Sequence, residues 1–300
     1  MKKNYKSAMK LTAMLLTVAM CMSFTACNTR GKGPRLGNGQ PVQVLREKGI
    51  NNALLAEMVE TGEIPPNAIS LDLSSNDGLS DITPLATLTE MRELQLRKTR
   101  VIDLDALSGM TKLETLYVTN NRVQNADAIA GLTNLKELNL WNNAINDISF
   151  VKNLTNLEVL AIQNNDNISD ISYLSGLTKL RQLWLNGNDI RDISPLEGLT
   201  ELETLWLDVN PISDISPLAK LTKLQNLHLD QLPIKDYSPL AELTELRELW
   251  LLGCKITDVE FLEDLRKLER LDLVNAEISD ELLKRARELV PAGCYIRTEV

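Results

Sequence analysis

One pattern recurs about ten times from Ala68 onward and constrains this chain more than any other feature. It reads Leu-x-Leu-x-x-Asn-x-Ile-x-Asp-Ile-x-x-Leu-x-x-Leu, and its first leucine returns every 22 or 23 residues. These leucines are Leu71, Leu94, Leu116, Leu138, Leu160, Leu183, Leu205, Leu227, Leu249 and Leu271. A unit this short cannot bury its apolar side alone and must stack on its neighbours. The chain is therefore predicted to be a solenoid, although 300 residues would allow two ordinary domains.

The spacing inside one unit predicts its shape. In Leu183–Leu185 the period of two predicts a strand with both leucines facing inward and Trp184 facing out. Ile190, Ile193, Leu196 and Leu199 then bury aliphatic groups from the opposite side of the turn. A 22-residue unit of this kind is a leucine-rich repeat. The predicted fold class is an α/β repeat solenoid: a horseshoe with a parallel concave β-sheet, short 3-10 or loop segments on the convex side, and helical caps.

An asparagine follows the strand in most units. A buried side-chain amide there would satisfy backbone groups that the turn leaves unpaired. The position holds Asn76, Asn121, Asn143, Asn165, Asn188 and Asn210. Elsewhere it holds Thr99, Leu232, Cys254 and Ala276. The last three units are therefore expected to depend more on apolar packing at this point.

Serine-proline and aspartate recur in the convex turn. Ser194-Pro195 and its equivalents are predicted to place a hydroxyl cap before a residue of fixed φ. Asp192, Asp214, Asp236 and Asp258 precede this turn. Recurring carboxylates invite a metal or acid–base interpretation, but catalysis needs one site, whereas a turn cap is needed in every unit. The aspartates are therefore interpreted as structural.

The N-terminal residues resemble a bacterial lipoprotein signal. A basic segment with Lys2, Lys3, Lys6 and Lys10 precedes an apolar stretch over 11–22, which is too short to span a membrane. The sequence Ser-Phe-Thr-Ala before Cys27 resembles a lipobox, with Phe where the family prefers Leu. The resemblance implies cleavage before Cys27 and its acylation, which would anchor the chain to a membrane outside the cytoplasm. The open alternative is an ordinary or uncleaved signal.

The expected domain organisation follows from these assignments. Residues 1–26 form the signal, 27–40 a flexible tether, 41–67 an N-terminal cap, 68–278 the repeats and 279–300 a C-terminal cap. Helices are expected over 50–60 and 281–290, and a last strand over 294–296. Cys254 and Cys294 are interpreted as buried small hydrophobic residues that do not form a disulfide, because about 10 Å would separate them across two units.

The repeat with the consensus N-x-I-x-D-I-x-P-L-x-x-L-T-x-L, after a small helical cap, resembles the repeat domain of the internalins over about residues 45–290. The internalins are bacterial surface proteins whose concave faces bind host receptors. The resemblance implies a protein or peptide partner. It does not extend to the immunoglobulin-like module, the wall-sorting signal or the wall-binding repeats of the well-known adhesins, so receptor-mediated invasion is not expected here.

Two columns of side chains should face out from the concave sheet. The central column holds Asp72, Gln95, Tyr117, Asn139, Ala161, Trp184, Trp206, His228, Trp250 and Asp272. The flanking column, two residues further along each unit, holds Ser74, Arg97, Thr119, Trp141, Gln163, Asn186, Asp208, Asp230, Leu252 and Val274. All four tryptophans and the single histidine of a chain with 4% aromatic residues fall in these columns.

This clustering predicts a ligand-binding surface, because an exposed apolar patch with a polar rim marks an interaction site and tryptophan is enriched at binding hot spots. The predicted binding residues are Tyr117, Trp141, Trp184, Trp206, Asp208, His228, Asp230 and Trp250. The alternative is that stacked rings merely stabilise the sheet. The preferred partner is a protein or peptide, and glycan binding or a structural role in the envelope are the alternatives.

Other functions are not supported by the residues. No cofactor is expected, and no enzyme, because we find no nucleophile with a base, no metal cluster and no phosphate-binding loop. A lone histidine argues against zinc, although Asp208 and Asp230 beside His228 would influence its charge. Without residues 1–26 the chain has 28 basic and 41 acidic residues, a net charge of −13, which argues against nucleic-acid binding.

Overall fold

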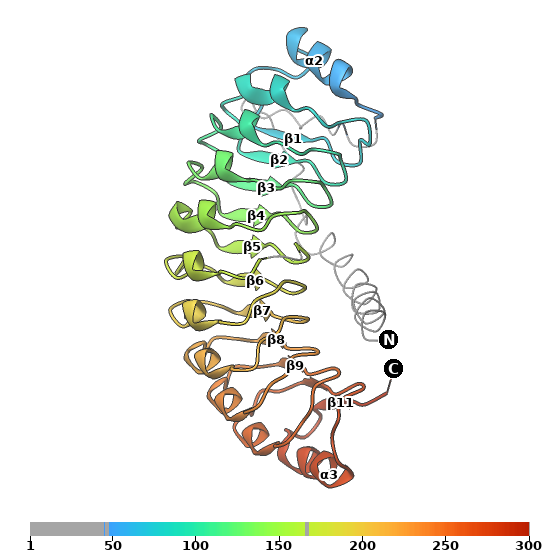
Figure 1. The fold of residues 1–300 in the computed structure, drawn as a ribbon, viewed down its shortest axis with the longest axis vertical. Coiled ribbons are helices and arrows are strands. Elements are labelled where there is room, and N and C mark those ends of the chain that lie inside the picture. The colour runs from blue at the N-terminus through green and yellow to red at the C-terminus, as the bar shows by residue number, and fades with distance from the viewer. Residues whose placement is uncertain (1–44, 46–47, 166–167, 300) are drawn as a thin grey trace.

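The computed structural model describes residue 45 and residues 48–165 and 168–299, and over them the chain forms one curved solenoid (Figure 1). Its single sheet has 11 parallel strands in sequence order. The strands are β1 (Ser70–Asp72), β2 (Glu93–Gln95), β3 (Thr115–Tyr117), β4 (Glu137–Asn139), β5 (Val159–Ala161), β6 (Gln182–Trp184), β7 (Thr204–Trp206), β8 (Asn226–His228), β9 (Glu248–Trp250), β10 (Arg270–Asp272) and β11 (Tyr295–Arg297). The predicted fold class is confirmed.

Each repeat leucine sits at the middle of its strand and pairs with the equivalent leucine of the next. Leu183 is in register with Leu160 on one side and Leu205 on the other. Both leucines of Leu183–Leu185 are fully buried, as the alternation predicts. The core is one continuous and mainly aliphatic column that runs from Leu45 to Ala286 and includes Phe150, Tyr237 and Phe261. Because every unit contacts only its neighbours, each internal unit depends on two interfaces and each end unit on one.

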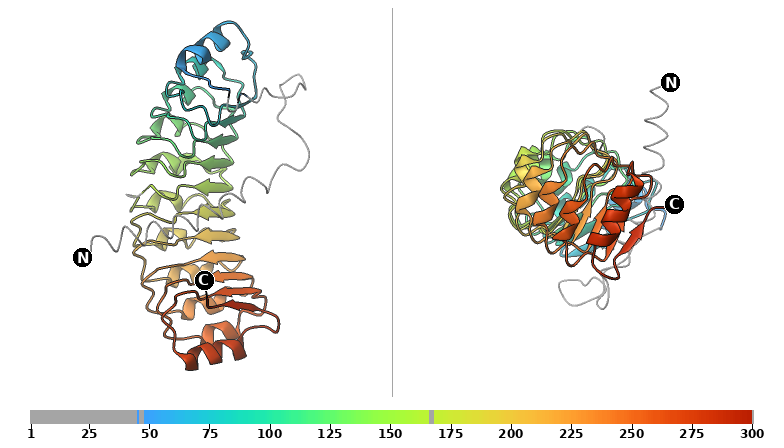
Figure 2. Two further views of the ribbon diagram at one scale, coloured as in Figure 1. Left: turned by 90° about the vertical axis from the view of Figure 1, so that its right-hand side faces the viewer. Right: turned by 90° about the horizontal axis from the view of Figure 1, so that it is seen from below.

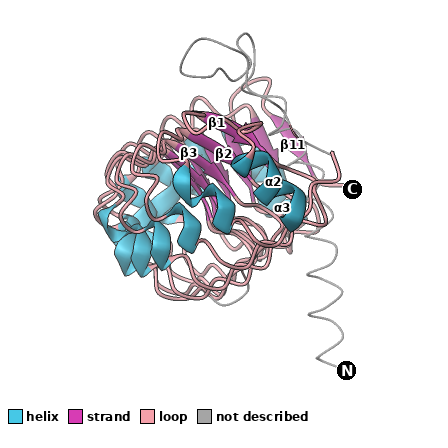
Figure 3. Ribbon diagram, turned by 90° about the horizontal axis from the view of Figure 1, so that it is seen from above, coloured by secondary structure: helices cyan, strands magenta, loops and turns pink. Residues whose placement is uncertain are grey.

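Short 3-10 helices form the convex side, and Figures 1 and 3 show them on the face opposite the strands. They are η2 (Thr83–Thr87), η3 (Asp105–Leu107), η4 (Asp127–Ile129), η5 (Ser149–Asn153), η6 (Ser172–Leu174), η7 (Ser194–Leu196), η8 (Ser216–Lys220), η9 (Ser238–Glu242) and η10 (Glu260–Glu263). A proline stands in the first turn of η7, η8 and η9, as the serine-proline pattern predicts.

The cap of these turns is the aspartate and not the serine. Asp192 Oδ1 accepts a hydrogen bond from the Ser194 backbone N–H at 2.8 Å, and Asp214 and Asp236 do the same for Ser216 and Ser238. The serine side chain makes no capping hydrogen bond in η7. The structural role of the aspartates is thus confirmed, whereas the predicted hydroxyl cap is wrong. Ser194 is itself the first residue of η7, and its own N–H is the donor that the aspartate satisfies.

The asparagines form the predicted buried ladder. Asn210 accepts from the Ile190 N–H with Oδ1 and donates from Nδ2 to the carbonyl oxygens of Leu185 and Leu207, so one amide joins two repeats. Two replacements keep part of this bonding. The Thr99 hydroxyl donates to the Leu96 carbonyl, and the Cys254 thiol donates to the Leu229 carbonyl at 3.2 Å. Cys254 therefore contributes a hydrogen bond as well as the apolar packing that the sequence predicts.

Both ends of the solenoid are closed. Helix α2 (Asn52–Glu60) caps the N-terminal end, and the side chain of its N-cap residue Asn51 accepts from the Leu54 N–H. Helix α3 (Asp280–Leu289) caps the other end, and its N-cap residue is Ser279. Figure 2 shows them at opposite ends of the arc. Both lie within two residues of the predicted ranges, and β11 begins one residue later than predicted.

The two cysteines of the folded part are free thiols, as predicted. Cys254 is buried, but Cys294 is only half-buried, because it precedes the edge strand β11. The segments predicted as signal and tether, with Cys27, lie outside the described residues. Among the described helices none has the length and apolar character needed to cross a bilayer.

Candidate functional site

The concave sheet carries the residues that the sequence singles out. Trp184, Trp206, His228 and Trp250 occupy successive strands β6 to β9 in register, and each faces away from the leucine core. Tyr117 lies two strands before β5 in the same central column. Trp141, Asp208 and Asp230 follow β4, β7 and β8 in the flanking column. The sequence therefore places all eight candidate residues correctly on one face.

The predicted exposure of the tryptophan stripe, formed by Trp184, Trp206, His228 and Trp250, is wrong. Trp184, Trp206 and Trp250 are only 2–7% exposed, and His228 is 5% exposed. Period-two alternation tells which face a side chain takes but not how far its neighbours cover it. Rings on adjacent parallel strands stand about 4.8 Å apart, so large side chains in one column shield each other. Tyr117, Trp141 and Asp230 retain partial exposure.

The four aromatic side chains form a continuous stack. The His228 ring lies between Trp206 and Trp250, with ring centroids 4.2 Å and 4.8 Å apart and both pairs nearly parallel. Trp184 meets Trp206 edge-on at 6.3 Å. The Arg270 guanidinium lies 4.2 Å from the Trp250 ring centre and continues the stack. Stacking of these rings stabilises the sheet. The alternative to ligand binding considered from the sequence was this same structural role.

Tyr117 is held in a similar way near the other end. The Arg97 guanidinium lies 4.3 Å from its ring centre, and its hydroxyl donates a hydrogen bond to Glu137. Burial and the neighbouring Glu137 carboxylate raise the pKa of Tyr117 above its usual value. The phenol is therefore neutral at physiological pH. It presents a polar edge and not a charge to the concave face.

Asp208, His228 and Asp230 come together beside the stack, as their register predicts. One donor atom of each lies within 4.8 Å of the others. Asp208 Oδ1 accepts from the Asp230 N–H at 2.9 Å, and Asp230 Oδ1 accepts from the Leu252 N–H at 2.8 Å. Each carboxylate thus uses one oxygen to hold the next strand end in place.

The electrostatics of this cluster are unusual for a surface. Burial, and then the Asp230 charge, raises the pKa of Asp208 well above its usual range. Burial raises the pKa of Asp230 to about 7. Burial, with a smaller effect of the Arg270 charge, lowers the pKa of His228 to about 3. The sequence predicts an influence of the two aspartates on the histidine charge, but the lowered pKa of His228 follows from burial and the Arg270 charge.

The flanking column also contains polar atoms without a hydrogen-bond partner. Within the described part of the chain, the buried atoms Trp141 Nε1, Gln163 Oε1 and Asn186 Oδ1 have none. The three residues follow β4, β5 and β6, so they stand in successive repeats. Sequence reasoning did not single out Gln163 and Asn186, because burial of a polar side chain is not visible in the repeat pattern. The sequence feature that could have indicated them is their place in the flanking column, directly before Asp208.

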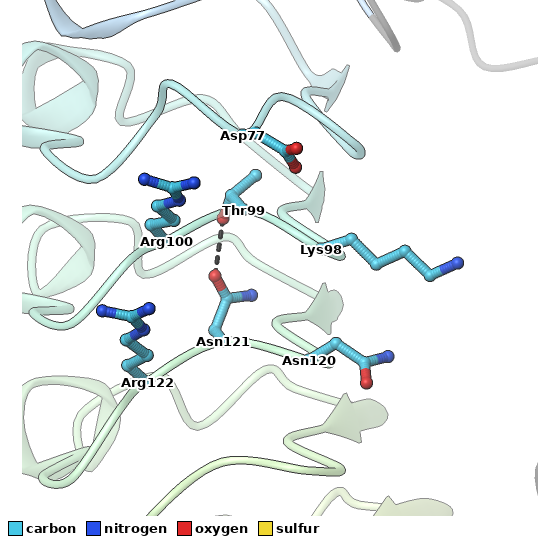
Figure 4. Close-up of a pocket in the computed structure, with 7 residues that line it drawn as sticks. All are labelled: Asp77, Lys98, Thr99, Arg100, Asn120, Asn121 and Arg122. Carbon is cyan, nitrogen blue, oxygen red and sulfur yellow. Dashed lines mark hydrogen bonds between the residues drawn. The ribbon is translucent and has the colours of Figure 1, made fainter.

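A hollow lies outside the concave face, where the chain leaves the first strands (Figure 4). It has a volume of about 270 Å³ and is lined by Asp77, Lys98, Thr99, Arg100, Asn120, Asn121 and Arg122. A hydrogen bond joins the side chains of Thr99 and Asn121 at its floor. Lys98, Arg100 and Arg122 are exposed, so water screens their charges, and none of the candidate residues of the stripe lies here.

Comparisons with known proteins agree with the repeat architecture. The family model for leucine-rich repeats in two copies matches residues 111–154, 133–178, 155–198, 178–220 and 200–242. No curated protein matches the chain. Among solved structures, the plant peptide hormone receptor RGFR1 in complex with RGF2 is 20% identical, with a TM-score of 0.61 over 73% of this chain and 41% of the receptor. At this identity the likeness shows the fold alone.

Two bacterial structures are more similar in sequence. An internalin (inlF) from Listeria monocytogenes is 33% identical, with a TM-score of 0.72 over 81% of this chain and 69% of the internalin. An internalin C2 (inlC2) from the same organism is 35% identical, with a TM-score of 0.61 over 66% of this chain and 92% of that chain. Leucine-rich-repeat proteins are typically binding scaffolds without catalysis, and nothing in these likenesses points to an enzyme. The chain therefore belongs to the internalin-like family of leucine-rich-repeat proteins.

Proposed function

We propose that this protein is displayed outside the cytoplasm on a lipid anchor and recognises a protein or peptide partner on its concave face. The single observation that carries the proposal is the row of unpartnered buried atoms Trp141 Nε1, Gln163 Oε1 and Asn186 Oδ1. A buried polar atom without a partner costs about 1–3 kcal/mol. A ligand that supplies the missing partners recovers this cost on binding.

The chemistry of the row suits a polypeptide. The three residues follow successive strands, so they stand side by side in neighbouring repeats. A polypeptide offers N–H donors for the Gln163 and Asn186 oxygens and a carbonyl acceptor for the Trp141 indole N–H. Carbohydrate binding would need open tryptophan faces, yet His228 and Arg270 cover the ring of Trp250 from the two neighbouring strands. The leucine-rich-repeat fold itself is typical of protein–protein binding.

The concave surface is tested with the variant Trp141→Ala/Gln163→Ala/Asn186→Ala. The parent is screened by biolayer interferometry against peptide libraries, surface proteins and glycans. We expect the variant to lose at least about tenfold in affinity for the hits, equivalent to ~1.4 kcal/mol. The matched control is Ile102→Ser, which removes an exposed apolar side chain from the turn between β2 and η3. A variant that keeps the parent's circular dichroism and binds every hit equally would contradict the proposal.

The anchor is tested separately through Cys27. Lipobox-like residues before this cysteine and the basic and apolar segments ahead of it support acylation. Bacterial cells expressing the parent or Cys27→Ala are fed an alkyne-labelled fatty acid. We expect label on the parent only, and the parent in the membrane fraction. Equal labelling of Cys27→Ala would rule out this lipidation site without bearing on the concave face.

A further inference from the structure

The cluster beside the aromatic stack has the composition of a metal site. It combines one imidazole with two carboxylates, and one ligand atom from each lies within 4.8 Å of the others. All three side chains come from consecutive repeats at β7 and β8, so the rigid sheet fixes their spacing. We propose that Asp208, His228 and Asp230 bind one divalent first-row transition cation such as Zn²⁺. This site is independent of the proposed partner.

The histidine supplies an independent indication. Its side chain is 95% buried, being 5% exposed, and no hydrogen bond within the described part of the chain involves its ring nitrogens. A buried imidazole ordinarily finds a partner for these atoms. Here its ligand atom lies among the carboxylates of Asp208 and Asp230.

The local charges also favour a cation. Asp208 and Asp230 are neighbouring carboxylates in a site that excludes most water, and like charges at this distance repel. The charged groups around them offer little compensation. Arg270 is engaged by Asp272 and by the Trp250 ring, and Asp272 adds further negative charge near Asp230. Burial raises the pKa of Cys254 to about 12, so this nearby thiol is neutral.

The donor set selects the class of metal. Imidazole with carboxylates suits zinc and the related transition ions, whereas Ca²⁺ and Mg²⁺ prefer oxygen ligands only. Tetrahedral zinc with bonds of about 2.1 Å requires ligand atoms roughly 3.4 Å apart. Because the three ligand atoms lie within 4.8 Å of one another, side-chain rotation has to shorten any pair by at most about 1.4 Å. In each aspartate one carboxylate oxygen accepts a backbone N–H, and the other oxygen remains available to bind the metal.

The single histidine of the chain makes the test direct. The full chain, purified without a histidine tag and stripped with a chelator, is labelled with ¹⁵N at histidine. Titration with ZnCl₂ at pH 7.5 is expected to move its one set of imidazole nitrogen signals, saturating at one equivalent. CaCl₂ and MgCl₂ at the same concentrations are expected to leave the signals in place. Zinc held only by a cysteine thiol would also leave them in place.

The variant Asp208→Asn/Asp230→Asn keeps the acceptors for the backbone hydrogen bonds and removes both anionic ligands. We expect it to bind zinc more than about 100-fold more weakly, the loss exceeding that of a typical outer-shell change. Its metal-free form should melt no lower than the parent, because the carboxylate repulsion is gone. Asp189→Asn, an exposed position in the same solenoid, is the matched control and should bind as the parent does.

Two results would overturn the proposal: imidazole signals that stay unchanged at saturating Zn²⁺, or signals that move equally in Asp208→Asn/Asp230→Asn. Because no partner is present in this titration, its failure leaves the proposed protein recognition untouched. Conversely, a protein that binds zinc but no polypeptide would retain the metal site and lose the proposed function.

Discussion

The buried pair Asp208 and Asp230 makes the metal-free protein less stable as pH rises. A carboxylate held in an ion pair has the opposite effect, because its pKa is lowered on folding. Asp230 has a pKa of about 7 in the folded chain against an ordinary value of 3.8. Between these pH values the folded state holds a proton that the unfolded state has lost, so stability falls as pH rises. His228, with its pKa lowered to about 3, acts in the opposite direction up to about pH 6.5. The two effects partly cancel in the parent.

The variant Asp230→Asn separates the two effects. It keeps the acceptor for the Leu252 N–H and removes the carboxylate. We expect it to be more stable than the parent at pH 7.5 by on the order of 2–4 kcal/mol, and equal to it near pH 4. Urea unfolding followed by tryptophan fluorescence, in the presence of a chelator, measures the difference. A constant difference from pH 4 to 8 would show that the carboxylate is ionised throughout.

Val209 is a second residue whose environment predicts a measurable effect. It has a φ of 56° directly after the flanking column, in the left-handed region that disfavours β-branched side chains. The same position holds Asn120, Asn142, Asn164 and Gly187 in other repeats. Val209→Asn should therefore stabilise the protein by about 1 kcal/mol, measured by chemical unfolding. The reverse change, Asn142→Val, should destabilise it by a similar amount, and gain of stability there would contradict the explanation.

At the level of the element, the convex turns repeat one capping device. Folding lowers the pKa of Asp214, because its carboxylate accepts hydrogen bonds from Ser216. Asn125 already fills the equivalent place before η4 and accepts from the Asp127 N–H at 2.6 Å. The side-chain oxygen and not the charge is thus the shared requirement.

This equivalence predicts different outcomes for two substitutions at Asp214. Asp214→Ala removes the acceptor and should lower the melting temperature, whereas Asp214→Asn should retain most of it. The lowered pKa means that the charge stabilises the fold above pH 3.8 and that this contribution disappears as pH falls. Both variants lack this carboxylate, so the stability that each loses relative to the parent should shrink as pH falls from 7 to 3, as measured by calorimetry. The extra loss of Asp214→Ala over Asp214→Asn should stay constant over this range. Equal losses in both would assign the effect to the charge alone.

The elements were predictable because the repeat fixes them locally. The period of 22 or 23 residues locates the leucine of every strand from β1 to β10, and α2 and α3 follow from cap residues and apolar spacing. The burial of Trp184 and Trp206 was not predictable in the same way, since it depends on side chains one repeat away on either side. The close approach of Asp208, His228 and Asp230 was hard to weigh from the sequence for a related reason. A search for histidine and cysteine spacing does not include carboxylates that the strand register brings next to a histidine.

At the scale of the whole molecule, the stack of units makes each end depend on a single interface. Asp272 is fully buried in β10, where its carboxylate pairs with Arg270 at 3.3 Å and with Arg297 of β11 at 3.2 Å. It also accepts from the Val274 N–H. This carboxylate therefore holds the terminal strand to the sheet and keeps Arg270 over the Trp250 ring.

Asp272→Ala leaves two arginines without their buried partner, a change that typically costs about 3–5 kcal/mol. In a solenoid whose units interact only with their neighbours, the loss should appear first at the damaged end. Hydrogen exchange followed by mass spectrometry should then show faster exchange in β9 to β11 and α3, with β1 to β4 unchanged. The exposed pair Lys112–Glu90 provides the control, since Glu90→Ala should leave both ends protected. Uniform loss of protection along the whole sheet would mean that the solenoid unfolds as one cooperative unit.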